Sequence, residues 1–140
     1  MVLREFDLTC DYEAALALWH TAGPGVHVGP SDTREELAKK IERDPELFLV
    51  LEEDGQIIGS VIGGFDGRRG LIYHLAVLPE RRGQGLGAQL MAAVEARLHA
   101  KGCRKCYLLV APENLEVLPF YEKLGWEEMP TRIMGKMLAE

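Results

Sequence analysis

The sequence has no long apolar run and no excess of positive charge, and each absence excludes a class of protein. No apolar run among its 140 residues approaches the length of a membrane span, and residues 1–6 lack the layout of a signal peptide. The 16 lysines and arginines are outnumbered by 22 aspartates and glutamates, so the net charge is -6. This balance argues against sequence-independent binding to nucleic acid or anionic lipid. We therefore expect a cytoplasmic protein whose partners are neither nucleic acids nor membranes.

Cysteine is scarce and odd in number, with Cys10, Cys103 and Cys106 as the only three. Three cysteines do not make a disulfide framework. Cys103 and Cys106 have CxxC spacing, but a structural zinc site needs four ligands and a redox pair needs a helix N-terminus. These two cysteines instead follow Gly102 and lead into an apolar run that is typical of a strand. We predict no metal site.

The overall composition is that of a soluble globular protein. Hydrophobic residues make up 47% of the chain and charged residues 27%, far from the composition of disordered chains. A length of 140 residues suits one domain and is too short for two domains of usual size. We therefore predict a single domain over residues 1–140.

The first half of the chain reads as strand, helix, loop, helix and hairpin. Residues 2–8 form an opening strand, and apolar residues then recur at helical spacing up to Trp19. Residues 23–30 hold three glycines and two prolines, which predicts a loop, and Asp32 with Glu35 has the spacing of a capping box for a second helix. Residues 47–51 and 56–63 are strand-like runs joined by Asp54-Gly55, a strong hairpin signal.

The second half predicts a third antiparallel strand and then a crossover. Residues 71–78 form that strand, and a helix after Gly85 is followed by a strand over residues 106–111. A short helix over residues 116–124 comes next, and residues 126–138 can supply one or two closing strands. The apolar face of the crossover helix is formed by Leu90, Met91, Val94 and Leu98.

The glycine-rich segment between strand and helix has the chemistry of a phosphate site. Its free backbone N–H groups and the helix dipole converge on one point, glycines leave room for a ligand, and Arg82 adds a permanent positive charge. The residues are Arg82, Gly83, Gln84, Gly85, Leu86 and Gly87. A glycine-rich connector that binds nothing is the plain alternative.

Two other phosphate-binding folds are weighed against this segment. Gly83, Gly85 and Ala88 also fit the G-x-G-x-x-G/A pattern of dinucleotide-binding proteins. A dinucleotide fold opens with this unit and continues with further parallel strands, whereas here the unit follows a meander and one crossover strand remains. A Walker-type loop is excluded because no Gly-Lys-Ser or Gly-Lys-Thr is present.

Three segments in family order resemble the GNAT superfamily of N-acetyltransferases, in particular its small bacterial YpeA-type members. Residues 82–87 match the signature Q/R-x-x-G-x-G/A, and Leu75-Ala76-Val77-x-Pro79 resembles the strand before it. The third segment is Asn114-x-x-Val117-Leu118-x-x-Tyr121-x-x-x-Gly125-Trp126. The resemblance implies a mixed α/β fold, with a mostly antiparallel central sheet of six or seven strands, about four helices, and two splayed central strands.

The resemblance also implies acetyl-coenzyme A as cosubstrate and assigns residues to it. The amides of residues 82–87 would hold the pyrophosphate, and Leu75, Ala76 and Val77 would pair with pantetheine as an added strand. Asn114 would reach the cofactor near the split between residues 71–78 and 106–111, although an asparagine there also suits a helix cap. Tyr121 would protonate the departing thiolate, or pack in the core as a plain aromatic.

The general base departs from the family pattern. The position two before Leu75, often a glutamate in relatives, is Tyr73, which we keep with Tyr121 as a candidate catalytic residue. Regular alternation would put Leu71, Tyr73 and Leu75 on one face and Ile72 and His74 on the other, so His74 would not take over. His27 in the loop of residues 23–30 is a weaker candidate beside the acceptor pocket.

These residues predict an enzyme that transfers acetyl from acetyl-coenzyme A to a primary amine of a small molecule, peptide or protein, by direct attack in a ternary complex. Without an obvious base, an α-amine or weakly basic amine is a better acceptor than lysine. The alternatives are a sensor that binds acyl-coenzyme A without turnover, and a structural domain whose loop binds nothing. The open sheet permits a monomer or a homodimer.

Overall fold

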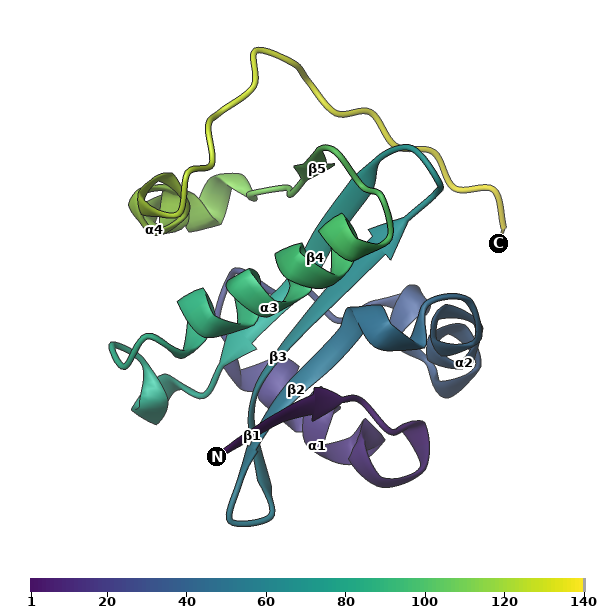
Figure 1. Cartoon of the computed structure of the whole chain (residues 1–140), viewed down its shortest axis with the longest axis vertical. Coiled ribbons are helices and arrows are strands. Elements are labelled where there is room, and N and C mark those ends of the chain that lie inside the picture. Colours follow the sequence, from purple (N-terminus) through teal and green to yellow (C-terminus); the bar gives the residue numbers. More distant parts are fainter. Residues whose placement is uncertain (140) are drawn as a thin grey trace.

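A computed structural model of the chain, which describes residues 1–139, has one five-stranded sheet in the order β1-β2-β3-β4-β5 (Figure 1). The first four strands pair as antiparallel neighbours, and β5 pairs with β4 in parallel. The strands are β1 (Val2–Glu5), β2 (Phe48–Glu53), β3 (Gln56–Phe65), β4 (Gly70–Val77) and β5 (Cys106–Tyr107). The predicted mixed α/β class, with a meander followed by one crossover, is confirmed.

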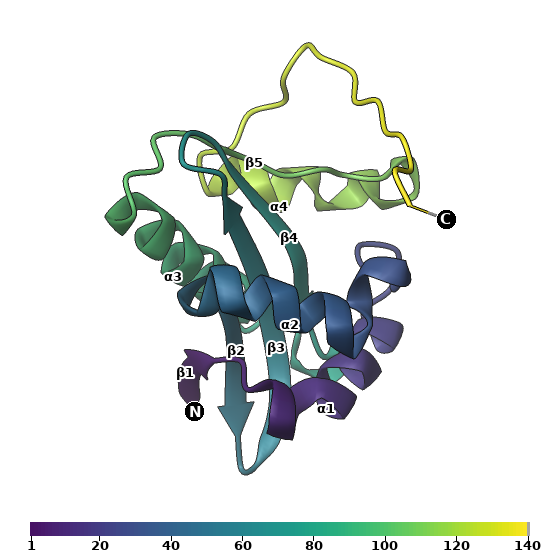
Figure 2. The ribbon, with the colours of Figure 1, turned by 90° about the vertical axis from the view of Figure 1, so that its right-hand side faces the viewer.

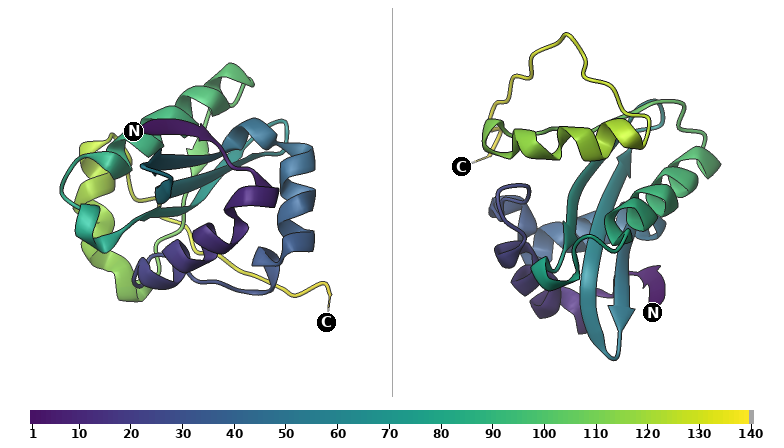
Figure 3. Two further views of the ribbon diagram at one scale, coloured as in Figure 1. Left: turned by 90° about the horizontal axis from the view of Figure 1, so that it is seen from below. Right: turned by 90° about the vertical axis from the view of Figure 1, so that its left-hand side faces the viewer.

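The helices lie on both faces of the sheet and at its end. Helices α1 and α2 cover one face, α3 covers the other as the crossover between β4 and β5, and α4 lies beyond β5 (Figures 2 and 3). Their bounds are α1 (Leu8–Thr21), α2 (Arg34–Arg43), α3 (Leu86–Ala100) and α4 (Leu118–Lys123). Short 3-10 turns occur at Pro30–Asp32, Pro45–Leu47, Pro79–Arg81 and Pro112–Val117. Within residues 1–139, no helix is long and apolar enough to cross a membrane.

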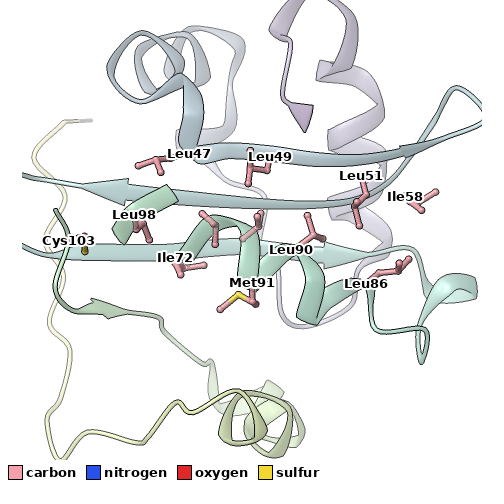
Figure 4. Packing of buried hydrophobic residues seen from close by; sticks show 12 residues of the cluster. Leu47, Leu49, Leu51, Ile58, Ile72, Leu86, Leu90, Met91, Leu98 and Cys103 are labelled. Atoms are coloured by element: carbon pink, nitrogen blue, oxygen red, sulfur yellow. The ribbon is translucent and has the colours of Figure 1, made fainter. Parts of the chain in front are cut away.

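The sheet separates two hydrophobic clusters. The cluster under α3 contains the predicted apolar face of that helix, packed on alternate residues of β2 (Figure 4). Leu90, Met91 and Val94 have no exposed surface, and Leu98 is 1% exposed. The other cluster, under α1 and α2, is built around Trp19, Leu37 and Phe48. A side chain of β4 therefore packs under α3 or under α1 and α2, depending on the face to which it points.

The hairpin prediction is confirmed by its turn. Asp54 and Gly55 both have left-handed backbone angles, with φ of 51° and 77°. Two such residues are what a two-residue turn between twisted antiparallel strands requires.

The strand count was predicted too high, and the C-terminal prediction is wrong. The sheet has five strands rather than six or seven, because β5 ends after Tyr107 and the predicted closing strands over residues 126–138 are absent from the described chain. Residues 127–139 are exposed and irregular. Pro130 cannot donate to a strand ladder and Gly135 offers no side chain to pack, so this stretch does not sustain a regular strand.

Candidate active site

β4 and β5 separate after two residue pairs, which leaves part of β4 as a free edge. Gly70 pairs with Cys106 and Leu71 with Tyr107, and no described strand pairs with residues 72–77 on that side. The chain beyond β5 turns away toward α4 (Figure 4). The expected splay of the central strands is therefore present. Leu75, Ala76 and Val77 lie on this free edge, where main-chain groups are available to an extended ligand.

A β-bulge interrupts β4 at the start of the free edge. Ser60 pairs with Ala76 and Ile62 pairs with Tyr73, so His74 and Leu75 together oppose a single residue of β3. His74 adopts a left-handed conformation with φ of 52°. Such angles are uncommon for residues other than glycine, although histidine is among those that tolerate them best.

The bulge reverses the predicted facing of His74. The His74 ring contacts Trp19 in the cluster under α1 and α2, whereas Leu75 packs against the cluster under α3. Tyr73 pairs opposite Ile62 and forms an edge contact with His74. The prediction that His74 lies on the face opposite Tyr73 is therefore wrong, because one extra residue shifts the alternation of side chains.

His74 is paired with a carboxylate that the sequence did not single out for function. Its Nε2 lies 2.9 Å from Oδ1 of Asp32, whose Oδ2 accepts the Gly29 N–H at 2.9 Å. The side chain of Asp32 is only 8% exposed, and that of His74 15%. Asp32 was predicted to cap the second helix, and this is wrong. The cap of α2 is Thr33, which accepts the Glu36 N–H, and Asp32 closes the preceding 3-10 turn.

A buried chain of hydrogen bonds fixes the backbone of His74. Trp19 Nε1 donates to Ser60 Oγ at 2.9 Å, and the Ser60 hydroxyl donates to the His74 carbonyl at 3.0 Å. Ser60 has no exposed surface and Trp19 is 1% exposed. The hydroxyl thus provides the partner that the bulge takes away from this carbonyl.

Ser60→Ala is expected to destabilise the fold by about 1–3 kcal/mol, because it leaves the buried indole N–H and the His74 carbonyl without partners. Urea unfolding followed by Trp fluorescence measures the change in the free energy of unfolding. Ser31→Ala, at an exposed serine, is the control and should leave stability unchanged. Equal stability of both variants would mean that the Trp19–Ser60–His74 chain does not hold the bulge.

The glycine segment before α3 has the shape expected of an anion site. Gly83 and Gly85 are left-handed, with φ of 78° and 79°, and an added Cβ at either position would meet nothing within 4 Å. Gly85 precedes α3 and no side chain caps the helix. The first-turn amides of an uncapped helix lack intrahelical partners. Open space, free amides and the positive helix end therefore coincide at this loop.

Gly87 serves a different purpose from the two glycines before it. A Cβ at Gly87 would lie 3.1 Å from Cζ of Phe120, so the glycine allows α4 to pack closely against the first turn of α3. Tyr121 is the next residue of α4. Two motifs that are 34 residues apart in the sequence, at Gly87 and Tyr121, therefore meet at one end of the molecule.

The two predicted catalytic tyrosines are both poor bases at neutral pH. Burial raises the pKa of the Tyr121 phenol, whose ring packs against Phe120 and Trp126 with centroids 5.0 and 6.3 Å away. Burial, followed by the charges of Asp32 and Asp44, raises the pKa of Tyr73. A phenol whose pKa lies above about 10 keeps its proton at pH 7 and can donate a proton but not accept one.

The loop between α1 and α2 touches both sides of the split. Arg82 Nη2 donates to the Ala22 carbonyl at 2.6 Å, and His27 Nε2 lies 3.0 Å from Oε1 of Glu113. A Cβ on Gly25 would lie 2.9 Å from Nδ2 of Asn114, so that side chain packs on the loop. Asn114 is not the cap of the turn at Pro112–Val117, which begins after Ala111, nor of α4.

The cysteines with CxxC spacing lie at the far end of the sheet. Cys103 is buried and its Sγ donates to the Lys105 carbonyl at 3.3 Å, while burial raises the pKa of the Cys106 thiol to about 11. Reactive cysteines have lowered pKa values, so Cys106 has the character of an inert thiol.

Comparison with known proteins gives consistent matches. The family model described as "Acetyltransferase (GNAT) family" matches residues 12–126. An acetyltransferase of Pectobacterium atrosepticum is 40% identical over 131 residues, which are 93% of this chain and 91% of that protein. The PaiA N-acetyltransferase of Thermoplasma acidophilum, solved in complex with coenzyme A, superimposes with a TM-score of 0.80 at 21% identity, covering 94% of this chain and 92% of that one. An aminoglycoside N-acetyltransferase in complex with coenzyme A gives a TM-score of 0.75 at 25% identity, covering 99% and 95%.

Proposed function

Because this chain belongs to the acetyltransferase (GNAT) family, we propose that it transfers the acetyl group of acetyl-coenzyme A to a primary amine by direct attack in a ternary complex. The observation that carries the proposal is the free edge of β4, over residues 72–77, which leads into the open left-handed glycines of the loop before α3. One extended ligand can pair with the first and place its phosphates on the second.

Acetyl-coenzyme A suits the chemistry of the β4 edge and of the loop before α3. The amides of residues 83–87 and the charge of Arg82 suit its pyrophosphate, and the main chain of Leu75, Ala76 and Val77 suits the two amide groups of pantetheine. Asn114, beyond the split, would contact the same arm from the other side. The coenzyme A complexes of the Thermoplasma and aminoglycoside enzymes, which share this fold, support the assignment.

Acetyl transfer needs a donor for the oxyanion and a proton for the departing sulfur. A backbone N–H among residues 75–77 provides the first, because the free edge has no strand to accept its hydrogen bonds. Tyr121 would provide the second, because its raised pKa keeps the phenol protonated and it follows Phe120, which packs against Gly87 of the glycine segment. A positioned general acid contributes roughly 10²–10⁴-fold to the rate.

The acceptor is proposed to be an α-amine or another weakly basic amine. A lysine amine, with a pKa of about 10.4, is neutral roughly once in two thousand at pH 7, a deficit of about 4–5 kcal/mol. An α-amine, near a pKa of about 8, needs far less help. β4 carries no carboxylate, and an amine of lower pKa depends less on a general base for its deprotonation.

The test is acetyl-coenzyme A turnover against four groups of acceptors: N-terminal peptides, lysine peptides, polyamines and amino acids. We expect thiol release with N-terminal peptides or amino acids above the rate with lysine peptides, and a higher melting temperature with acetyl-coenzyme A. A melting shift without turnover of any acceptor would favour an acyl-coenzyme A sensor. If coenzyme A does not raise the melting temperature, both the acetyltransferase and the sensor are excluded. A preference for lysine peptides would overturn the proposal that the acceptor is a weakly basic amine.

A further inference from the structure

We propose that His74, oriented by Asp32, is the base that removes a proton from the acceptor amine, an inference that rests on the proposed function. The bulge in β4 brings His74 to the face of Tyr73 and to the first residues of the free edge. His74 therefore lies on the same face of β4 as Tyr73, the residue at the position where relatives often have a glutamate. Asp32 does not touch the acceptor in this scheme and is a positioning residue.

The hydrogen bond to Asp32 determines which imidazole nitrogen is available. Asp32 accepts the Gly29 N–H on Oδ2 and faces His74 Nε2 with Oδ1, so the ring hydrogen belongs on Nε2. The neutral imidazole then carries its lone pair on Nδ1. Among residues 1–139, every buried side-chain nitrogen and oxygen has a hydrogen-bond partner, and Nδ1 makes none of the bonds found there. Nδ1 is therefore open to solvent or to a ligand.

Two aromatic rings hold the imidazole in this orientation. The Trp19 ring lies edge-on at 4.7 Å between centroids, and the Tyr73 ring lies edge-on at 5.5 Å. The backbone is fixed as well, because Ser60 donates to the His74 carbonyl. The left-handed backbone of His74 is strained. Three neighbouring residues and the Asp32 carboxylate hold it in this conformation. Such strain collects at functional sites.

The charges that face His74 favour a cationic acceptor. Asp32 comes from the turn before α2, and Asp44, at the end of α2, acts on the neighbouring Tyr73. The charge of Asp44 is offset by three cations, because Lys40 Nζ lies 3.1 Å, Arg43 Nε 3.4 Å and Lys101 Nζ 3.8 Å from its carboxylate, so Asp32 is the carboxylate that acts on the ring. The remaining groups around the ring, from α1, β3 and β4, are the uncharged Trp19, Ser60 and Tyr73. An ammonium ion is thus drawn toward a base with a carboxylate behind it.

The proposed acetyl transfer is balanced in protons and electrons with His74 and Tyr121 as the acid–base groups. Nδ1 of His74 takes one proton from the acceptor ammonium, and the nitrogen lone pair forms a C–N bond to the acetyl carbonyl carbon. The C–S bond breaks with its electron pair on sulfur, which takes the proton of the Tyr121 phenol. The second proton on the new amide nitrogen restores the phenol, and His74 releases its proton to water. The net products are the acetylated amine, the free thiol and one proton.

The experiment measures kcat/KM against pH for the wild type, His74→Asn and Asp32→Asn, using the best acceptor of the turnover panel and a second acceptor of different amine pKa. Asparagine tolerates a left-handed backbone and has no titrating group, so His74→Asn keeps the bulge without the base. Melting temperature and acetyl-coenzyme A affinity report on folding. His99→Asn, at an exposed histidine near the C-terminal end of α3, is the matched control.

We expect His74→Asn to lower kcat by about 10²–10³-fold with acetyl-coenzyme A affinity unchanged, and His99→Asn to leave both unchanged. The wild-type profile should have an acid limb that is the same for both acceptors, in addition to the limb that follows the amine. The acceptor-independent limb should vanish in His74→Asn. Asp32→Asn should lower kcat without lowering the melting temperature, because the asparagine amide can donate to Nε2 and thereby leave the ring hydrogen on Nδ1.

The outcomes separate this inference from the proposed function. If the wild type turns over an amine and His74→Asn keeps both its kcat and the acceptor-independent limb, the base assignment is overturned and the acetyltransferase remains. If Asp32→Asn keeps the wild-type kcat, or lowers it only together with the melting temperature, Asp32 does not orient the base and the pairing argument fails. If the wild type binds acetyl-coenzyme A and acetylates no amine, both proposals are overturned.

Discussion

Replacing Gly85 with aspartate is expected to weaken acetyl-coenzyme A binding about 100-fold, or roughly 2.7 kcal/mol, while the protein stays folded. Gly85 is left-handed with φ of 79° and its Cβ direction is open, so the fold itself leaves room for a side chain. Aspartate and asparagine tolerate this backbone better than other residues. In the proposed site, however, a carboxylate there would face the ligand's pyrophosphate and repel it where the helix amides would attract it.

Asparagine at the same position separates charge from size. Gly85→Asn adds a side chain of nearly the same shape without the negative charge, and we expect about a tenfold loss of affinity or less. The gap between the two variants should narrow as salt is added, because the Debye length falls to about 3 Å at 1 M. Isothermal titration measures both affinities.

Gly55→Asp provides the matched control for strain. Gly55 is left-handed with φ of 77°, also has open space around it, and lies in the hairpin turn after Asp54. This variant should bind acetyl-coenzyme A like the wild type. If Gly85→Asp bound as tightly as Gly55→Asp, the loop before α3 would not be the pyrophosphate site.

Local rules account for the parts of the fold that the sequence predicted well. The apolar face of α3 follows from helical periodicity alone, and the β2–β3 hairpin follows from Asp54-Gly55. The turn before α3 was predictable for the same reason, since Gly83 and Gly85 adopt the left-handed angles that glycine tolerates without steric cost. In each case the residues that decide the structure are neighbours in the chain.

The His74–Asp32 pair could not be predicted, because no local signal produces it. The bulge falls on Tyr73, His74 and Leu75, where no glycine marks an irregularity, and a shift of one residue reverses the faces of all that follow. The partner carboxylate is 42 residues away in the sequence. Asp32 also fits a helix-cap pattern, so its spacing to Glu35 favoured a local interpretation that the fold does not adopt.

In the C-terminal stretch, a local signal predicted strands that the fold does not form. Residues 126–138 contain enough apolar side chains to suggest strands, yet Ile133, Met134 and Met137 are exposed and unpaired with the sheet. Composition alone does not make a strand, because pairing requires a neighbour with free main-chain groups in register. The nearest parallel strand, β5, has only two residues in the ladder.

Tyr121→Phe is expected to lower kcat by about 10²–10⁴-fold while leaving the affinity for acetyl-coenzyme A unchanged. The substitution removes only the hydroxyl, so the packing of the ring against Phe120 and Trp126 and the contact of α4 with Gly87 remain. In the proposed mechanism, the lost hydroxyl is the proton donor to the departing sulfur. The effect should therefore appear in kcat rather than in binding, because the hydroxyl acts on a charge that develops only during the reaction.

The raised pKa of Tyr121 also predicts how kcat depends on pH. Burial raises the pKa of Tyr121 above its ordinary value of about 10, so the acid form persists through neutral pH and is lost only above that value. Wild-type kcat should fall on this alkaline side as the phenol ionises, and the fall should be missing from the residual rate of Tyr121→Phe. Tyr107→Phe, in β5, is the control and should keep both the rate and the alkaline limb. Equal kcat in wild type and Tyr121→Phe, with binding intact, would reduce Tyr121 to a packing residue and require another source for the proton on sulfur.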